Sequence, residues 1–78
     1  MKQIKVLGPG CAKCVTTYKN ALEAVKSLNM EVEVIKIEDI EEMMKYNILS
    51  TPVLMIDNNI KVKGRVAEIN EIRELLQQ

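Results

Sequence analysis

The sequence has no histidine and only two cysteines among its 78 residues. A structural zinc ion usually takes four nitrogen or sulfur ligands, so this supply argues against a zinc site within one chain. Small secreted domains are stapled by sets of disulfides, and one pair is too few for that class. A bridge between Cys11 and Cys14 would close a very short loop and would constrain the unfolded chain very little. The value of the pair is therefore chemical.

The sequence also lacks an excess of either charge and lacks a long apolar run. Eleven Lys and Arg residues balance eleven Asp and Glu residues, whereas binding to nucleic-acid phosphates needs a clustered positive surplus. The longest apolar run, Val53–Ile56, is far shorter than the ~20 residues that span a bilayer. The N-terminus enters a strand pattern with no apolar signal segment. We expect a cytoplasmic protein that binds neither nucleic acid nor membrane.

No internal repeat, low-complexity tract or linker interrupts the chain, so residues 1–78 are expected to form one domain. Hydrophobic periodicity predicts strands and helices in alternation. In chain order these are a strand at 3–7, a helix at 12–28, a strand at 32–37, a helix at 39–46, strands at 53–56 and 60–63, and a last helix after Gly64. A β–α–β crossover makes the first two strands parallel. The prediction is an α/β fold, βαβαββα, with a four-stranded mixed sheet and helices on both faces.

Apolar residues at steps of three and four predict the buried face of each helix. The expected buried residues are Val15, Tyr18, Leu22, Val25 and Leu28 in the first helix, Ile40, Met43 and Met44 in the second, and Val66, Ile69, Ile72, Leu75 and Leu76 in the last. Asp39 and Glu42 have the spacing of a capping box, in which each side chain accepts from a backbone N–H of the other residue. We therefore expect the second helix to begin at Asp39.

The cysteines follow a Gly-Pro-Gly turn (residues 8–10) and lie at the first turn of a predicted helix. Unpaired N–H groups and the positive end of the helix dipole favour a thiolate there, and Lys13 adds positive charge. Such sites lower a cysteine pKa from about 8.5 to about 3.5–7.5. The two-residue spacer, Ala12-Lys13, places both sulfurs within bonding distance. We expect Cys11 to attack a substrate disulfide and Cys14 to resolve the mixed disulfide, as in thiol–disulfide exchange.

The strand, turn and Cys-x-x-Cys helix start, together with Thr51-Pro52 before an apolar strand and Gly64 after the predicted hairpin, resemble the thioredoxin/glutaredoxin superfamily. The length and element order are most similar to its short members, the small thioredoxin-like redox-active disulfide proteins. The resemblance implies a minimal thioredoxin-like fold, and a cis Pro52 beside the cysteines, with Thr51 presenting its backbone to the substrate. It implies a redox-active disulfide without further cofactor or metal, and protein disulfides and a reductase as partners. We expect a monomer, because nothing in the sequence indicates a large exposed apolar patch. The supporting site residues would be Gly10, Ala12, Lys13, Thr51, Pro52 and Gly64.

The chain departs from the better-known members of that superfamily. It lacks the Trp before the first cysteine and the Gly-Pro spacer of thioredoxin, and the Pro-Tyr spacer common in glutaredoxins. The acidic, glycine-rich segment that holds glutathione is replaced by residues 64–68, which argues against glutathione as a partner. The buried acid of thioredoxin also has no match, because Gln3 and Lys5 occupy that strand. A proton acceptor for Cys14 must come from elsewhere.

Two other functions fit a Cys-x-x-Cys pair. Two thiolates suit Cu(I), so a soft-metal carrier of the ferredoxin-like, heavy-metal-associated class is the main alternative. That class has methionine two residues before its first cysteine, where this chain has Pro9, and a strand hairpin after the first helix, where this chain has an Asp39-capped helix. A redox-inert interaction domain would need unreactive cysteines.

Overall fold

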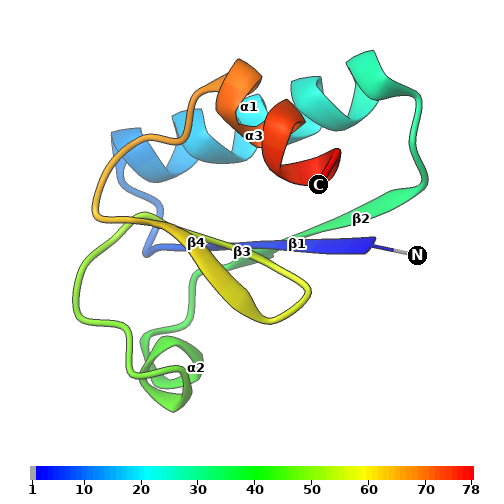
Figure 1. Cartoon of the computed structure of the whole chain (residues 1–78). Helices are drawn as coiled ribbons and strands as arrows, with labels where there is room; N and C mark the ends of the chain where they lie inside the picture. Colours follow the sequence, from blue (N-terminus) through cyan, green and yellow to red (C-terminus); the bar gives the residue numbers. More distant parts are fainter. Residues whose placement is uncertain (1) are drawn as a thin grey trace.

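The computed structural model describes residues 2–78, over which seven elements follow the predicted βαβαββα order (Figure 1). They are β1 (Lys2–Leu7), α1 (Ala12–Leu28), β2 (Val32–Ile37), α2 (Ile40–Lys45), β3 (Val53–Ile56), β4 (Asn59–Lys63) and α3 (Ile69–Leu76). None of these helices is long and apolar enough to cross a membrane. The predicted fold class, α/β with a four-stranded mixed sheet, is confirmed.

The sheet has the strand order β2-β1-β3-β4. Ile4 of β1 pairs in parallel with Val34 of β2 and antiparallel with Ile56 of β3. The β3–β4 hairpin is antiparallel and has an irregularity between Leu54 and Met55. Because β3 lies inside the sheet with layers on both faces, all of its residues are buried, as its continuous apolar run predicted.

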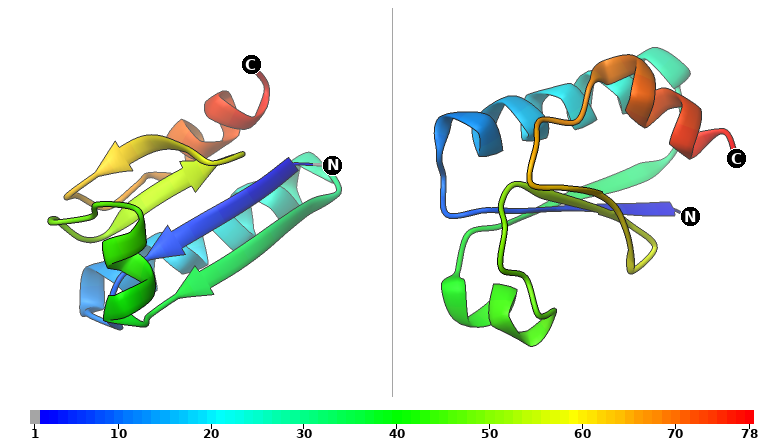
Figure 2. Two further views of the ribbon diagram at one scale, coloured as in Figure 1. Left: turned by 90° about the horizontal axis from the view of Figure 1, so that it is seen from below. Right: turned by 60° about the vertical axis from the view of Figure 1, so that its left-hand side comes forward.

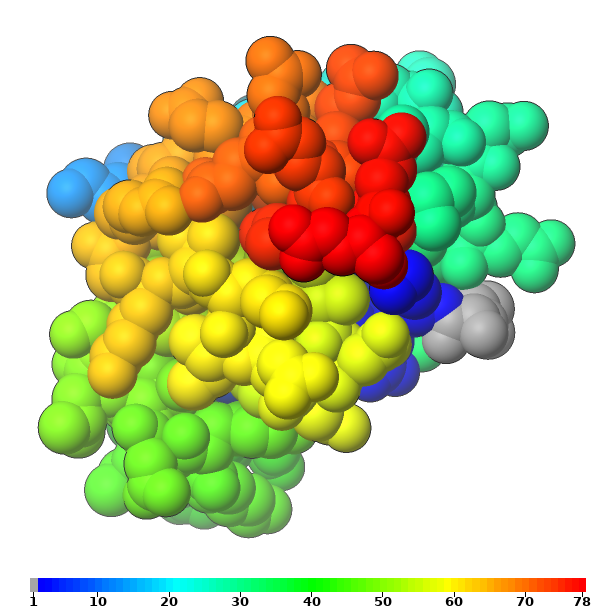
Figure 3. Space-filling model, in the orientation of Figure 1, coloured from blue at the N-terminus to red at the C-terminus, as the bar shows by residue number. Residues whose placement is uncertain are grey.

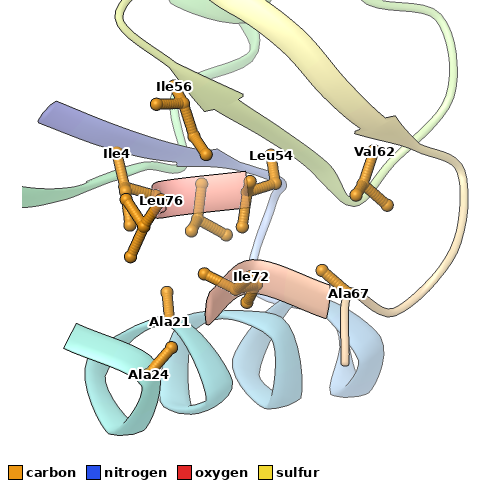
Figure 4. Packing of buried hydrophobic residues seen from close by; sticks show 10 residues of the cluster. Ile4, Ala21, Ala24, Leu54, Ile56, Val62, Ala67, Ile72 and Leu76 are labelled. Atoms are coloured by element: carbon orange, nitrogen blue, oxygen red, sulfur yellow. The ribbon is translucent and has the colours of Figure 1, made fainter. Parts of the chain in front are cut away.

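Helices α1 and α3 cover one face of the sheet and α2 covers the other (Figure 1, Figure 2). Alternation along the strands supplies a core to each face. Toward α1 and α3 lie Ile4, Val6, Leu54, Ile56 and Val62 with Ile72 and Leu76 (Figure 4), and toward α2 lie Leu7, Val53 and Met55 with Met43 and Ile48. In the space-filling view, the β4 segment separates α3 from α2 (Figure 3).

The buried face of α1 differs from the prediction by about one residue. Its buried residues are Cys14, Thr17, Ala21 and Ala24, whereas Leu22 is 44% exposed. Small side chains allow α1 to pack closely on the sheet and α3, so the larger apolar residues lie on the flanks. There Tyr18, Val25 and Leu28 are partly buried against the core, and Val15 is also half-buried. Hydrophobicity alone could not identify a face made of small residues.

The prediction for α2 is correct in its start and wrong in two details. Asp39 is the N-cap, but its carboxylate accepts from the Glu41 N–H at 3.0 Å, and Glu42 pairs with Lys45 at 3.2 Å instead of closing a capping box. Met43 is buried, whereas Ile40 and Met44 are 63% and 67% exposed. A helix of six residues has room to bury only one row of side chains against the sheet.

The last helix begins later than its apolar pattern suggested. Its N-cap is Glu68 and its first residue is Ile69, so Val66 lies in the connection from β4. The Glu68 N–H donates to Glu71 Oε1 at 3.3 Å. Ile72 and Leu76 are buried as predicted.

Candidate active site

The two cysteines lie where the chain leaves β1 and starts α1, at one end of the sheet (Figure 2). Gly10 has a φ of 92°, a left-handed conformation that glycine adopts without strain, and it turns the chain into the helix. Cys11 is the N-cap of α1 and forms a disulfide with Cys14, with the two Cα atoms 5.0 Å apart. Cys11 is exposed and Cys14 is 5% exposed. A thiolate arriving from solvent therefore meets Cys11 first.

Cys11 Sγ accepts a hydrogen bond from the Cys14 backbone N–H at 3.2 Å. This N–H belongs to the first turn of the helix, where backbone donors have no partner inside the helix. A hydrogen bond to the charged form of a group, together with the positive end of the helix dipole, favours that charged form. A Cys11 thiolate at this position would accept the same hydrogen bond, and the thiolate is the nucleophilic form of a cysteine.

Gly8 belongs to the site and was not singled out from the sequence, where it was assigned only to the turn. A Cβ atom at Gly8 would overlap Cys14 Sγ and lie 3.0 Å from Cys14 Cβ and 3.8 Å from Thr51 Cβ. The Gly8 N–H donates to Ile37 O at 2.9 Å, which fixes this backbone beside β2. The bare backbone of Gly8 is thus the surface on which the Cys14 sulfur packs.

The segment before β3 reaches the same place from the other side. The Thr51–Pro52 peptide bond is cis, Pro52 is buried and Thr51 is half-buried. The carbonyl of Pro52 accepts from the Gly64 N–H at 2.9 Å, and Gly64 has a φ of 76°. The structure therefore places Thr51 next to Cys14 and Gly8, and Gly64 against Pro52. Their expected roles in holding a substrate remain predictions.

The exposed rim beside Cys11 carries both charges. Ala12 and Lys13 are exposed, so the spacer faces solvent. Glu38 Oε2 lies 3.2 Å from the position that a Cβ of Gly10 would occupy, and it pairs with Lys36 at 3.6 Å. Glu38 was not predicted from the sequence, because its proximity to Gly10 depends on the end of β2 lying beside the end of β1.

The connection after Gly64 is held to α3 by an ion pair. Arg65 donates two hydrogen bonds to the Glu71 carboxylate, one of them at 2.8 Å. The hydrogen bonds from Arg65 hold the pKa of Glu71 below its ordinary value, and burial opposes this effect. The connection that carries Gly64 is therefore anchored at neutral pH.

The lowered Glu71 pKa predicts a pH dependence of stability. A carboxyl whose pKa is lower in the folded state stabilises the fold above its ordinary pKa, and the contribution is lost as the pH falls through the lowered value. The effect should be small because the Arg65 and Glu71 side chains are 57% and 30% exposed. We expect Glu71→Gln to decrease Tm slightly at neutral pH and not in acid, as followed by circular dichroism. An equal decrease at both pH values would contradict this assignment.

Within the described residues, no three His, Cys, Asp or Glu side chains gather as a group that could hold a metal ion. The reactive groups of the site are the sulfur atoms of Cys11 and Cys14. One sulfur is exposed at a helix N-terminus and the other is buried behind it, and they can exchange between a disulfide and a dithiol.

Comparison with known proteins agrees with this site. A family profile described as a thioredoxin domain matches residues 2–77. A thioredoxin of Methanothermobacter thermautotrophicus is 38% identical over 76 residues, which cover 97% of this chain and 99% of the relative. A thioredoxin of Methanocaldococcus jannaschii is 34% identical over 76 residues, which cover 97% of this chain and 87% of the relative. The chain therefore belongs to the thioredoxin family and is a thiol–disulfide oxidoreductase.

Proposed function

We propose that the protein reduces protein disulfides through Cys11 as nucleophile and Cys14 as resolving residue. The Cys11 thiolate attacks one sulfur of the substrate disulfide, forms a mixed disulfide and releases the other substrate sulfur as a thiolate. Cys14, after giving its proton to water, attacks Cys11 Sγ and releases the second substrate thiolate, which leaves the Cys11–Cys14 disulfide. The substrate gains two electrons and the protein loses two. The observation that supports this order is the exposed Cys11 bridged to a nearly buried Cys14.

We infer that the surface beside the sulfurs suits a protein disulfide better than a small-molecule disulfide. Leu49 is 94% exposed and precedes Thr51 by two residues, so their Cα atoms are at most ~7.6 Å apart. Thr51 in turn lies next to Cys14. An exposed apolar side chain at this position can be covered by the surface around a substrate disulfide, which stabilises the encounter by burial of apolar area.

A change at Leu49 tests this preference. We expect Leu49→Ser to lower kcat/KM for a protein disulfide several-fold and to leave the reduction of a small aromatic disulfide unchanged. Leu22→Ser is the matched control, since Leu22 is also exposed but lies about 12 Å along the helix from Cys14. Equal rates of Leu49→Ser and wild type with insulin would contradict a docking role for Leu49.

The same proposal specifies partners and setting. The oxidised protein needs a reductase to return it to the dithiol, and no cofactor beyond the disulfide takes part. We propose a cytoplasmic location, where the reducing environment favours reduction of substrates as the working direction. We further propose that residues 1–78 act as one domain and as a monomer, without glutathione, nucleic acid or membrane as partners.

One assay separates this function from metal carriage. The thiols are titrated against a dithiothreitol redox buffer, and insulin reduction is measured with and without Cu(I) or Zn(II). The proposal expects a reversible two-electron couple and insulin reduction that needs no metal. Tight one-to-one metal binding without turnover would replace it with the soft-metal carrier.

A further inference from the structure

Thr17 is a buried polar residue that the exchange reaction as described does not use. Its side chain is fully buried, at 0% exposure. Its hydroxyl finds no hydrogen-bond partner among the protein groups of residues 2–78. A buried hydroxyl without a partner loses its interaction with water and gains nothing in return. Valine would fill the same space without this cost, so the hydroxyl calls for an explanation.

Thr17 lies one helical turn after Cys14 on the buried face of α1. Side chains at positions i and i+3 of a helix are neighbours, with Cβ atoms about 5–6 Å apart. Each Cα–Cβ bond also tilts toward the helix N-terminus, so the Thr17 side chain leans over the turn that carries Cys14. The row continues with Ala21 and Ala24, which have no polar side-chain atoms. Cys14 is therefore the side chain of this row to which the Thr17 hydroxyl can donate a hydrogen bond.

The ability of Cys14 to accept a hydrogen bond changes during the reaction. In the oxidised protein its sulfur is bonded to Cys11, and a disulfide sulfur is a weak acceptor. After reduction the sulfur can rotate about the Cα–Cβ bond, and as a thiolate it is a strong, charged acceptor. The hydroxyl is therefore unpaired in the state that the structure shows and can be paired in the state that attacks Cys11.

Among the described residues, the groups packed around Cys14 include no charged side chain that could stabilise its thiolate. Gly8, against which the sulfur packs, and Thr51, whose Cβ lies 3.8 Å from the position of a Gly8 Cβ, have no ionisable side chain. Lys5 on β1 points to the α2 side of the sheet, where its Nζ donates to Tyr46 Oη and Asn58 Oδ1, each at 2.9 Å. The charged groups of the rim, Lys13, Lys36 and Glu38, are exposed or at the turn beside Cys11. The donor that the buried face of α1 provides is the neutral hydroxyl of Thr17.

We propose that Thr17 is a positioning residue for the resolving step, whose Oγ1–H donates a hydrogen bond to the Cys14 thiolate once the disulfide is open. This inference rests on the proposed resolving role of Cys14. The proton of the Cys14 thiol passes to water, the hydroxyl keeps its own proton, and the thiolate then forms its bond to Cys11 Sγ as the substrate sulfur leaves. Stabilising the thiolate makes the buried sulfur available for attack at a lower pH.

Thr17→Val, which keeps the shape, and Thr17→Ser, which keeps the hydroxyl, test the proposal. The equilibrium with dithiothreitol is measured as a function of pH. Above the pH at which Cys14 ionises, we expect Thr17→Val to shift the equilibrium about tenfold toward the disulfide, or about 30 mV. Below that pH the shift should disappear, because a neutral thiol gains little from the donor. Thr17→Ser should stay within about twofold of wild type throughout.

A second measurement follows the Cys14 thiolate by its ultraviolet absorbance in a Cys11→Ser background. The proposal expects Thr17→Val to raise the Cys14 pKa by about one unit and Thr17→Ser to leave it near the wild-type value, in line with the tenfold effect. Unchanged pKa and unchanged equilibrium in Thr17→Val, with the thermal stability raised, would overturn it and leave Thr17 as a structural residue. If Thr17→Val does not fold, Thr17→Ala takes its place. Neither measurement uses a protein substrate, so failure to reduce insulin would count against the proposed function alone.

Discussion

Replacing Cys14 with serine is expected to stop the reaction at the mixed disulfide, with the substrate held on Cys11. Cys11 is exposed and its sulfur accepts the Cys14 N–H, and both features remain when the Cys14 side chain ends in a hydroxyl. The first exchange should therefore proceed. The second exchange needs a sulfur nucleophile behind Cys11, and a serine hydroxyl does not ionise at neutral pH. We expect turnover with insulin to fall at least about a hundredfold, which is about 2.7 kcal/mol in the barrier.

The trapped species is the decisive readout. Incubation of Cys14→Ser with an oxidised protein substrate should give a covalent adduct that is seen by mass spectrometry and removed by dithiothreitol. Cys11→Ser is the matched control and should give neither turnover nor adduct, because the remaining Cys14 is 5% exposed. Full turnover of Cys14→Ser would show that Cys14 does not resolve the intermediate. An adduct on Cys14 in the Cys11→Ser variant would reverse the two roles.

Gly8→Ala is expected to disrupt the site through one methyl group. The new Cβ would overlap the Cys14 sulfur and lie 3.0 Å from Cys14 Cβ, so either the strand end or the helix start has to move. The Gly8 N–H is bonded to Ile37 O, which ties the strand end and leaves the helix start to give way. Overpacking of this kind costs about 1–3 kcal/mol. We expect lower stability in denaturant and a loss of insulin reduction of at least about tenfold, which corresponds to 1.4 kcal/mol.

A loss of activity through general destabilisation has to be separated from displacement of Cys14. Ile72→Val is a suitable control, since Ile72 is buried in the core between the sheet and the α1–α3 layer and this change costs about 0.5–1.5 kcal/mol. The control should be less stable yet fully active at a temperature where both variants are folded. Gly8→Ala with wild-type activity would show that the Cys14 sulfur does not depend on the bare backbone at Gly8.

Much of the fold followed from short-range patterns. The alternation of β-branched strands with amphipathic segments identified the seven elements, and the unbroken apolar run of Val53–Ile56 correctly indicated a strand covered on both faces. Asp39 was correctly predicted as a helix N-cap. These features depend on interactions within a few residues of the chain or on burial of a whole segment. Both can be recognised from the pattern of residue types in the sequence.

The predictions that failed concern which side of a helix faces inward. The Leu22 side of α1 looked buried because it is large and apolar, yet Ala21 and Ala24 face the core. Met44 looked like core beside Met43, yet it is 67% exposed. Which face of a helix is buried depends on the distance between the layers and on the space that remains when two helices share one side of a sheet. The periodicity of one segment contains no information about either quantity.

The cysteine pair could be predicted from local sequence, because a two-residue spacer at a helix start, after a strand, brings Cys11 and Cys14 together through local backbone geometry. The surroundings of that pair depend on long-range packing. It set Gly8 against the Cys14 sulfur, joined Pro52 to Gly64, brought Glu38 to the rim and buried the Thr17 hydroxyl on the face of α1 that also carries Cys14. Contacts of this kind join residues far apart in the chain, so they form only when strands pair and layers pack. This packing selects among many arrangements that each local pattern allows.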